Sequence, residues 1–209
     1  MKIMFIPAKV NQEVNIKKIE SLSSRLPKRI AIAYSIQYRD IAERIKEILL
    51  KKHEITLFIQ VLGCSRPKFP EKTEAILLVS SGRFHAVSLA LESGIPVYVL
   101  EHDKLAKIPE EEIKGLKKKK LASYIRFLNA DRVGIMVSTK PGQENMKKAL
   151  ALKKRLKNKE SYLFICNEIN TKDFENFPDI KSWVNTACPR LDFDSSIINI
   201  SDLTGYSKN

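Results

Sequence analysis

Two cysteines stand out because of where they lie along the chain. Cys188 follows the short apolar pair Trp183-Val184 and directly precedes a proline and an arginine. Because proline lacks an N–H and its ring fixes φ, Cys188 is expected in a turn just beyond a strand end, with its thiol presented there. Cys64 lies in a similar place, after the segment 59–63. The residues leave open whether the two thiols meet, as metal ligands, or are separate buried groups.

Four polar loops that carry glycine or cysteine follow expected strands. Ligand sites in open parallel sheets lie at the carboxyl ends of the strands, so these loops are expected to form the rim of one ligand crevice. The loops contain Gly63-Cys64, Ser80 to His85, Ser138 to Gln143 and Asn185 to Asp194. Each loop also fits ordinary turn and capping roles, so spacing alone predicts a crevice and does not identify its ligand.

Length and composition exclude several protein classes. The chain has 209 residues, of which 44% are hydrophobic, enough for one large or two small packed domains. It has no run of 18 apolar residues, and its first apolar stretch is too short for a signal peptide, so we expect a cytoplasmic protein with no membrane span. An odd number of cysteines, three, in such a chain does not favour a disulfide framework.

The net charge of +13 is concentrated in one part of the chain. Between Lys104 and Lys159 there are seventeen Lys or Arg residues and five Asp or Glu residues, a net charge of +12. Such a segment is typical of the solvated faces of lysine-rich helices, and it also favours an acidic partner or nucleic acid by long-range attraction. The nucleic-acid partner is the less favoured of the two, because the aromatic residues that single-strand binding needs are not interleaved with the cations.

Hydrophobic periodicity predicts strands and helices in alternation. Apolar runs of strand length occur at residues 28–34, 54–61, 75–79, 95–100, 133–137, 162–166, 183–184 and 197–200. Helices are expected at 11–26, 37–52, 85–93, 116–129 and 142–158, a first short strand at 1–6, and a charged connection at 101–115.

This alternation predicts the α/β fold class. We expect two similar small domains, each with a mainly parallel sheet flanked by helices and right-handed crossovers. The first domain is expected at residues 1–103 and the second at 131–209, joined by a basic helical connection at 104–130.

Four motifs in these loops resemble, in order and approximate spacing, those of the archaeal diphthamide synthase family. They are Val61-Leu-Gly-Cys-Ser65, Ser81-Gly-Arg-Phe-His85, Val137-Ser-Thr-Lys-Pro-Gly-Gln143 and Val184-Asn-Thr-Ala-Cys-Pro-Arg190. The family enzyme, 2-(3-amino-3-carboxypropyl)histidine synthase, uses a 4Fe-4S cluster and S-adenosylmethionine. It transfers the 3-amino-3-carboxypropyl group to a histidine of translation elongation factor 2, by radical-type chemistry.

The resemblance implies roles for particular residues. Cys64 matches the cluster cysteine of the family's middle domain, and Cys188 that of its last domain. Thiolates are the usual ligands of iron–sulfur clusters, and a site with three cysteines leaves one iron open for S-adenosylmethionine. The residues that match loops facing the family's central cleft, and so are implied to bind this cofactor, are Gly82, Arg83, Phe84, His85, Ser138, Thr139, Lys140, Gly142 and Gln143. No catalytic side chain is assigned.

The backbone of Arg83-Phe84-His85 adds a physical reason for that role. This segment is expected to open a helix, so its N–H groups would receive a carboxylate such as that of the methionine part of the cofactor.

The match is incomplete in one respect. The chain begins where the family's middle domain would begin, so the first of three domains and its cysteine are expected to be missing. Cys166 is the one other cysteine, but the family pattern does not call for a cysteine on that strand, and we interpret it as a small buried hydrophobe. The third cluster ligand would then come from another chain, from a second copy of this chain, or from a group other than cysteine.

Two classes of function follow. The chain is an enzyme subunit that acts on elongation factor 2 as a homodimer or with a chain that supplies the missing domain. Alternatively, it is a non-catalytic accessory or paralogous subunit that keeps the fold. A third class, a nucleic-acid binder through the basic segment, is less favoured for the reason given above.

Overall fold

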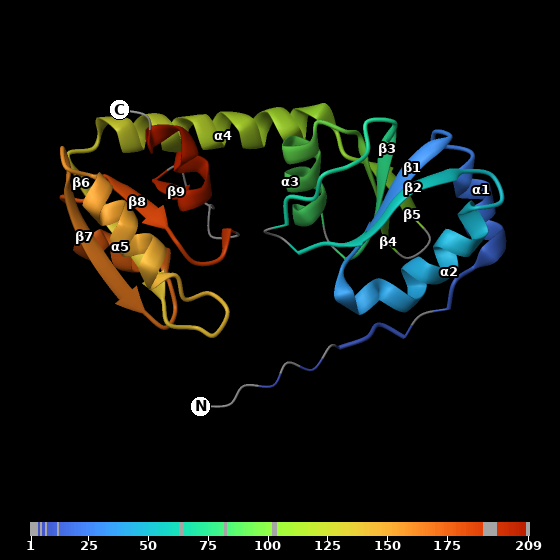
Figure 1. Ribbon diagram of the computed structural model, residues 1–209, viewed down its shortest axis with the longest axis horizontal. Coiled ribbons are helices and arrows are strands. Elements are labelled where there is room, and N and C mark those ends of the chain that lie inside the picture. Colours follow the sequence, from blue (N-terminus) through green and yellow to red (C-terminus); the bar gives the residue numbers. More distant parts are fainter. Residues whose placement is uncertain are drawn as a thin grey trace. The chain divides into compact units, whose positions relative to one another are not determined.

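The computed structural model describes residues 4, 6, 8–11, 13–62, 65–81, 83–101, 104–189 and 196–207, without the side chains of Phe84 and residues 204–207. The chain divides into a first unit, Met1–Leu116, and a second unit, Lys117–Asn209. Each unit is built around its own, mostly parallel sheet, as the sequence predicts for the α/β class (Figure 1).

The first unit contains a five-stranded sheet in the order β2-β1-β3-β4-β5. Its strands are β1 (Arg29–Tyr34), β2 (Glu54–Gln60), β3 (Ala75–Val79), β4 (Val97–Glu101) and β5 (Lys104–Lys107). The first four are parallel, and β5 pairs antiparallel with β4 at the edge. All five residues of β3 are buried, which explains why the central strands appear in the sequence as unbroken apolar runs.

Helices cover both faces of this sheet. One face packs against α1 (Ile16–Ser23) and α2 (Arg39–Leu49), which follows the short 3-10 helix η1 (Ile36–Tyr38). The other face packs against α3 (Phe84–Ser93) and the segment that leads into α4 (Glu110–Asn129). Gly94 ends α3 in the left-handed conformation, with φ of 69°, as its place in the sequence predicts.

The second unit contains a four-stranded, fully parallel sheet in the order β7-β6-β8-β9. Its strands are β6 (Arg132–Ser138), β7 (Glu160–Cys166), β8 (Ser182–Asn185) and β9 (Ile197–Asn199). On one face, α4 and α5 (Met146–Arg155) pack through Phe127, Ala149 and Leu152. The 3-10 helices are η2 (Thr171–Asn176), between β7 and β8, and η4 (Ile200–Ser207), after β9.

The other face of the second sheet packs against aromatic side chains. The indole of Trp183 stacks on Phe174, with ring centroids 4.2 Å apart, and meets the edge of Phe164 at 4.7 Å. The ring lies against Gly134 of β6, where an added Cβ would come within 2.4 Å of the indole. A glycine is therefore required at that point of the central strand, because the ring occupies the space of any side chain.

Some expected elements differ from the structure. The connection expected at 101–115 contains β5 and the first turn of α4, so that prediction was wrong. The missed signal was Pro109 followed by three glutamates, since proline at the start of a helix and acidic residues in its first turn both favour helix formation. The helix expected at 142–158 begins only at Met146, because Gly142 adopts φ of 77° in a turn before it. The strand expected at 1–6 falls mostly on residues outside the described ranges.

No helix in the described part of the chain is both long enough and apolar enough to cross a membrane.

Candidate functional site

The candidate site in the second unit lies at the carboxyl edge of its sheet. Because all four strands are parallel, their last residues lie along one edge. These residues are Ser138 of β6, Cys166 of β7, Asn185 of β8 and Asn199 of β9. Cys188 follows β8 by three residues, in the loop where the sequence predicts it, and its side chain is partly exposed and forms no disulfide.

The side chain of Asn185 holds the backbone of the Cys188 loop. Its Nδ2 donates to the carbonyl oxygen of Cys188 at 2.7 Å, and its Oδ1 accepts from the N–H of Ala187 at 2.9 Å. The same Nδ2 also donates to Oδ1 of Asn199 at 2.7 Å. Only 1% of Asn185 is exposed, so these bonds form away from water, where an unmade bond would be costly.

Asn199 fixes the next residue of the loop. Its Nδ2 donates to the carbonyl oxygen of Pro189 at 3.1 Å, while its Oδ1 accepts from Asn185. Two buried amides from neighbouring strands thus hold the carbonyls on either side of the Cys188–Pro189 bond. The position of the cysteine backbone is therefore set by the sheet rather than by the loop alone.

Thr186 and Asn145 attach the same loop to β6 and to the segment before α5. The hydroxyl of Thr186 donates to the carbonyl of Met136 at 2.7 Å. Nδ2 of Asn145 donates to the carbonyl of Thr186 at 2.9 Å and to that of Gln143 at 3.3 Å. Two of the loops expected from the sequence, Ser138 to Gln143 and the Cys188 loop, are therefore linked through the side chain of Asn145.

In the Ser138 to Gln143 loop, most polar side chains already have partners within the protein. The buried hydroxyl of Ser138 donates to the carbonyl of Asn167 at 3.2 Å and accepts from the N–H of Lys140 at 3.1 Å. The hydroxyl of Thr139 donates to Oδ1 of Asn167 at 3.4 Å. Ser138 and Thr139 thus shape the loop, and any ligand contact from them competes with these bonds.

Lys140 of this loop forms an ion pair with Glu168. Its Nζ lies 2.5 Å from Oε1 of Glu168, and the bond donated by Lys140 lowers the pKa of that carboxyl. Both side chains reach solvent, so the pair is weak and an anionic ligand would compete with Glu168 for the cation. Glu168 was not selected from the sequence, and its position just after β7 is the signal that could have indicated it.

The predicted loop Ser80 to His85 belongs to the first unit. It leads into α3, whose first residue is Phe84, and no side-chain hydrogen bond caps this helix at Arg83. The Ser80 hydroxyl is buried and has no hydrogen-bond partner within the described ranges. Both features suit a loop that binds an anionic or polar group, because donors at a helix start attract negative charge.

The guanidinium of Arg83 points toward α4 and pairs with Glu112, with Nη2 and Oε1 2.8 Å apart. Arg83 also borders a pocket of about 390 Å³. The other residues that line the pocket are Val99, Glu101, Lys104, Ala106 and Ile108.

Several predicted site residues lie outside what the structure describes. Cys64 and Gly82 are outside the described ranges, as are residues 190–195, and the side chain of Phe84 is not described. His85 is described and partly buried at the start of α3. The roles expected for these residues stay predictions.

Cys166 differs from Cys188 in its surroundings. It is the last residue of β7, and burial raises the pKa of its thiol, with a smaller contribution from Asp173. Because β6 separates β7 from β8, the two strands that lead to these cysteines lie roughly 10 Å apart, twice the spacing of neighbouring strands. Cys166 is partly exposed rather than fully buried as the sequence suggested, and it forms no disulfide.

The described residues supply one thiol suited to bind a metal cluster. In the ranges that the structure describes, no group of three or more His, Cys, Asp and Glu side chains lies together. Cys188 has the properties of a cluster ligand. It is partly exposed, it forms no disulfide, and hydrogen bonds hold the backbone of its loop. The other matched thiol, Cys64, is outside the described ranges.

Comparisons with known proteins give a consistent result. The family model described as "putative diphthamide synthesis protein" matches residues 1–199. The 2-(3-amino-3-carboxypropyl)histidine synthase of Methanocaldococcus jannaschii is 30% identical over 213 residues, which cover 95% of this chain and 58% of that protein. The synthase of Pyrococcus horikoshii is 32% identical over 140 residues, covering 65% of this chain and 40% of that protein.

A solved structure shares the fold. The crystal structure of Dph2 from Pyrococcus horikoshii with a 4Fe-4S cluster matches with a TM-score of 0.77 and 23% sequence identity, covering 97% of this chain and 67% of that one. The chain spans about half the length of the curated relatives it matches.

Proposed function

Because the chain belongs to the diphthamide synthesis family, we propose that it takes part in the transfer of the 3-amino-3-carboxypropyl group from S-adenosylmethionine to a histidine of translation elongation factor 2. The relatives it matches are named synthases of this histidine product, and some are named as subunit 1 of such a synthase. The proposed role is that of a subunit, as a homodimer or with a partner chain, acting in the cytoplasm where translation factors work.

The single observation that carries this proposal is the way Cys188 is held. Its loop carries the family motif, and buried amides of Asn185 and Asn199 fix the carbonyls of Cys188 and Pro189. A cysteine needed only for packing would not require two buried amides on its loop. A thiolate ligand does benefit, since metal sites depend on firmly oriented ligands.

In this proposal, Cys188 and Cys64 are two ligands of a 4Fe-4S cluster. When bound, the cluster would supply the electron chemistry that begins the radical-type group transfer, with one iron open to S-adenosylmethionine. The third ligand would come from a partner chain, from a second copy of this chain or from a group other than cysteine. Cys166 is not assigned to it, because the family pattern does not call for a cysteine on that strand and because β6 separates that strand from β8.

The loops Gly82 to His85 and Ser138 to Gln143 are proposed to bind S-adenosylmethionine. In the first loop, the uncapped start of α3 offers backbone N–H groups to the methionine carboxylate. Arg83 and Lys140 would each exchange an exposed carboxylate partner, Glu112 or Glu168, for the cofactor. Ser138 and Gly142 would shape the loop rather than touch the ligand.

A second candidate function, a non-catalytic accessory subunit, is favoured by one observation. Only two cysteines of the chain, Cys64 and Cys188, match cluster ligands of the family, in which a cluster is held by three. The two functions are distinguished by a transfer assay with labelled S-adenosylmethionine, elongation factor 2 and a separately produced chain that carries the family's first domain. The proposal predicts label on the histidine, lost in Cys188→Ala and kept in Cys166→Ala.

Label that is unchanged by Cys188→Ala would contradict the assigned role of that thiol. Absence of label from every mixture, with cluster-loaded partner present, would leave the accessory role as the function of this chain.

A further inference from the structure

A strip of apolar side chains is exposed on α4 within the second unit. Leu121, Ile125 and Leu128 follow one another at intervals of four and three residues, so they lie on one face of the helix. They are 58%, 48% and 43% exposed, which is unusual for three large neighbouring side chains of a helix in a packed domain. The opposite face is not available for binding, because Ser123 and Phe127 are buried there.

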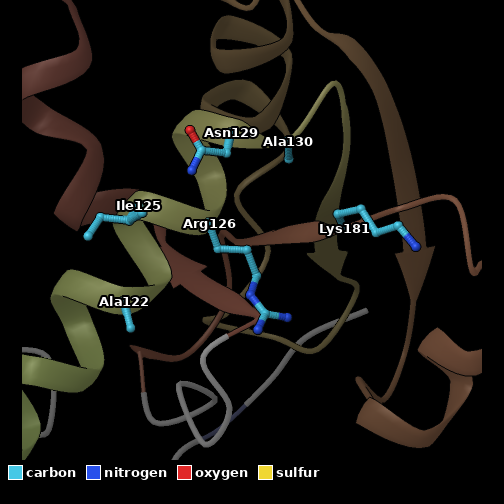
Figure 2. Close-up of a pocket in the computed structure, with 6 residues that line it drawn as sticks. All are labelled: Ala122, Ile125, Arg126, Asn129, Ala130 and Lys181. Atoms are coloured by element: carbon cyan, nitrogen blue, oxygen red, sulfur yellow. The ribbon is translucent and has the colours of Figure 1, made fainter.

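A pocket of about 460 Å³ adjoins this strip. Figure 2 shows that α4 and the residue after it supply most of the lining, and that Lys181 comes from the segment that leads into β8. The lining residues are Ala122, Ile125, Arg126, Asn129, Ala130 and Lys181. Ile125 belongs to both features, so the strip and the pocket form one surface, called here the α4 surface.

Most charged side chains on this part of α4 are cations. Residues 117–129 contain five cations, Lys117 to Lys120 and Arg126, and no carboxylate. Within the described ranges, Lys120 pairs with Asp202, but no ion pair forms at Arg126. Nζ of Lys181 donates to the carbonyl of Pro178, and no carboxylate in the described part of the chain forms an ion pair with it.

We propose that the α4 surface binds an acidic amphipathic helix of a partner protein. The apolar face of such a helix would cover Leu121, Ile125 and Leu128 and place one large side chain in the pocket. Its carboxylates would meet the flanking lysines and Arg126. This is the pattern of a helix bound in a groove, where anchors recur every three to four residues.

The charge argues against other occupants. A two-fold pairing of two copies through this surface would bring the same cations face to face, since such an interface repeats one patch on both subunits. A flat lipid surface would leave the pocket unfilled, and a nucleic acid would not use the apolar strip. An acidic amphipathic helix would use all three features of the α4 surface: the apolar strip, the pocket and the cations.

The test uses a fluorescent 18-residue synthetic peptide of leucine, alanine and glutamate with all leucines on one helical face. Its binding to the full chain would be followed by anisotropy at physiological salt. We expect the double variant Ile125→Gln and Leu128→Gln to weaken binding at least tenfold. Arg126→Glu is expected to weaken it about fivefold, because a flanking rim charge contributes less than buried apolar anchors.

Matched controls exist in the same unit. Leu150→Gln removes an apolar side chain of α5 that is also 43% exposed, and Lys172→Glu reverses an exposed charge on η2. Both controls should bind as the unchanged protein does, and a peptide of the same composition with scrambled leucines should bind at least tenfold more weakly.

Equal affinity for the scrambled peptide, or equal losses in the control variants, would overturn the proposal. It would also be overturned if anionic vesicles or single-stranded RNA bound more tightly than the peptide and lost their affinity in the same α4 variants.

Discussion

The first four strands of the two units have the same order but are packed differently. In each unit the first strand is central, the second lies beside it at the edge, and the third and fourth follow on the other side. The first strands both begin with an arginine, Arg29 and Arg132, and pair in the same register with the third strands. The third residues, Ala31 and Gly134, are thus equivalent, and so are the residues opposite them, Ile76 and Trp183.

The difference at these positions shows how one topology is packed in two ways. In the first unit, Ala31 and Ile76 face α3, so an alanine fits beneath a helix. In the second unit no helix is described between β7 and β8 other than the short η2, and the ring of Trp183 fills the space. A large ring on the third strand therefore requires glycine on the first.

The ends of the third strands also differ between the units. By strand register, the buried amide of Asn185 in β8 occupies the position that Leu78 occupies in β3. The first unit thus ends its strand in the apolar core, while the second places a polar network there that holds Cys188. The network marks the second unit as the one whose third loop is fixed by its sheet.

The largest effect is expected from filling the space under the indole. Gly134→Ala would place a Cβ within 2.4 Å of a ring held by Phe174 and Phe164, so we expect a loss of about 3 kcal/mol in unfolding free energy, the upper range for overpacking. Trp183, the only tryptophan of the chain, reports the transition by fluorescence in urea.

The equivalent change in the first unit is the control. Ala31→Gly removes one buried methyl group and should cost about 1 to 2 kcal/mol, mainly through backbone freedom and lost burial. If Gly134→Ala unfolds at the same urea concentration as the unchanged protein, the proposed difference in packing between the units is wrong.

The next effect concerns the polar network. Asn185→Leu gives the second unit the residue type found in the first, and it leaves the Ala187 N–H, the Cys188 carbonyl and Asn199 short of a partner. We expect a loss of about 2 kcal/mol and faster alkylation of Cys188 by iodoacetamide, because a buried unmet hydrogen bond is costly and the loop is released.

Cys166 serves as the internal control for this experiment, since it lies on β7 and outside the network. Mass spectrometry would give both alkylation rates in one sample. An unchanged rate at Cys188 would show that the amides do not hold its loop.

A smaller effect is expected at two glycines with positive φ, one in each unit. Gly94 has φ of 69° at the end of α3, and Gly142 has φ of 77° in the Ser138 to Gln143 loop. An added Cβ meets nothing within 4 Å at either position, so alanine should cost only the backbone strain, about 1 kcal/mol. Asparagine, which tolerates this conformation better, should recover part of the loss. Thermal unfolding of the four variants would test this, and a loss well above that value at Gly142 would indicate a contact that glycine alone permits.

The smallest effect is expected from the ion pair between Arg29, at the start of β1, and Glu74. The backbone N–H of Arg29 donates to Glu74 and, with a smaller contribution from its guanidinium, lowers the pKa of that carboxyl. A carboxyl whose pKa is lower in the folded protein stabilises the fold above its unfolded pKa, and this contribution disappears as pH falls through the folded pKa. Glu74→Gln should thus be slightly less stable at pH 7, and its difference from the unchanged protein should shrink below about pH 4.5. A difference in melting temperature that does not vary between pH 7 and pH 3 would contradict the assignment.

Much of the fold was predictable from the sequence because its signals are local. Apolar runs predicted eight of the nine strands that the structure describes, and the bounds agree to the residue at the fully buried strand Ala75–Val79. Gly94 marked a helix end. The edge strand β5 was missed because only Leu105 of its four residues is buried, which leaves no periodic pattern.

The candidate site was predictable only in part. The strand ends and the thiol of Cys188 could be placed, since proline after cysteine indicates a turn. The roles of Asn185, Asn199 and Asn145 could not, because their partners are backbone carbonyls brought near only by the sheet register. The ion pairs of Lys140 and Arg83 likewise depend on contacts between residues 28 and 29 positions apart.

The central claim is that Cys188 is a cluster ligand while Cys166 is not. It is tested most directly by iron and sulfide content after anaerobic reconstitution, for the chain alone and mixed with a chain that carries the family's first domain. We predict a brown, iron-containing species that Cys166→Ala retains and that Cys188→Ala and Cys64→Ala lose. Equal iron in the Cys188→Ala variant and the unchanged protein, or loss of iron only in Cys166→Ala, would contradict the account.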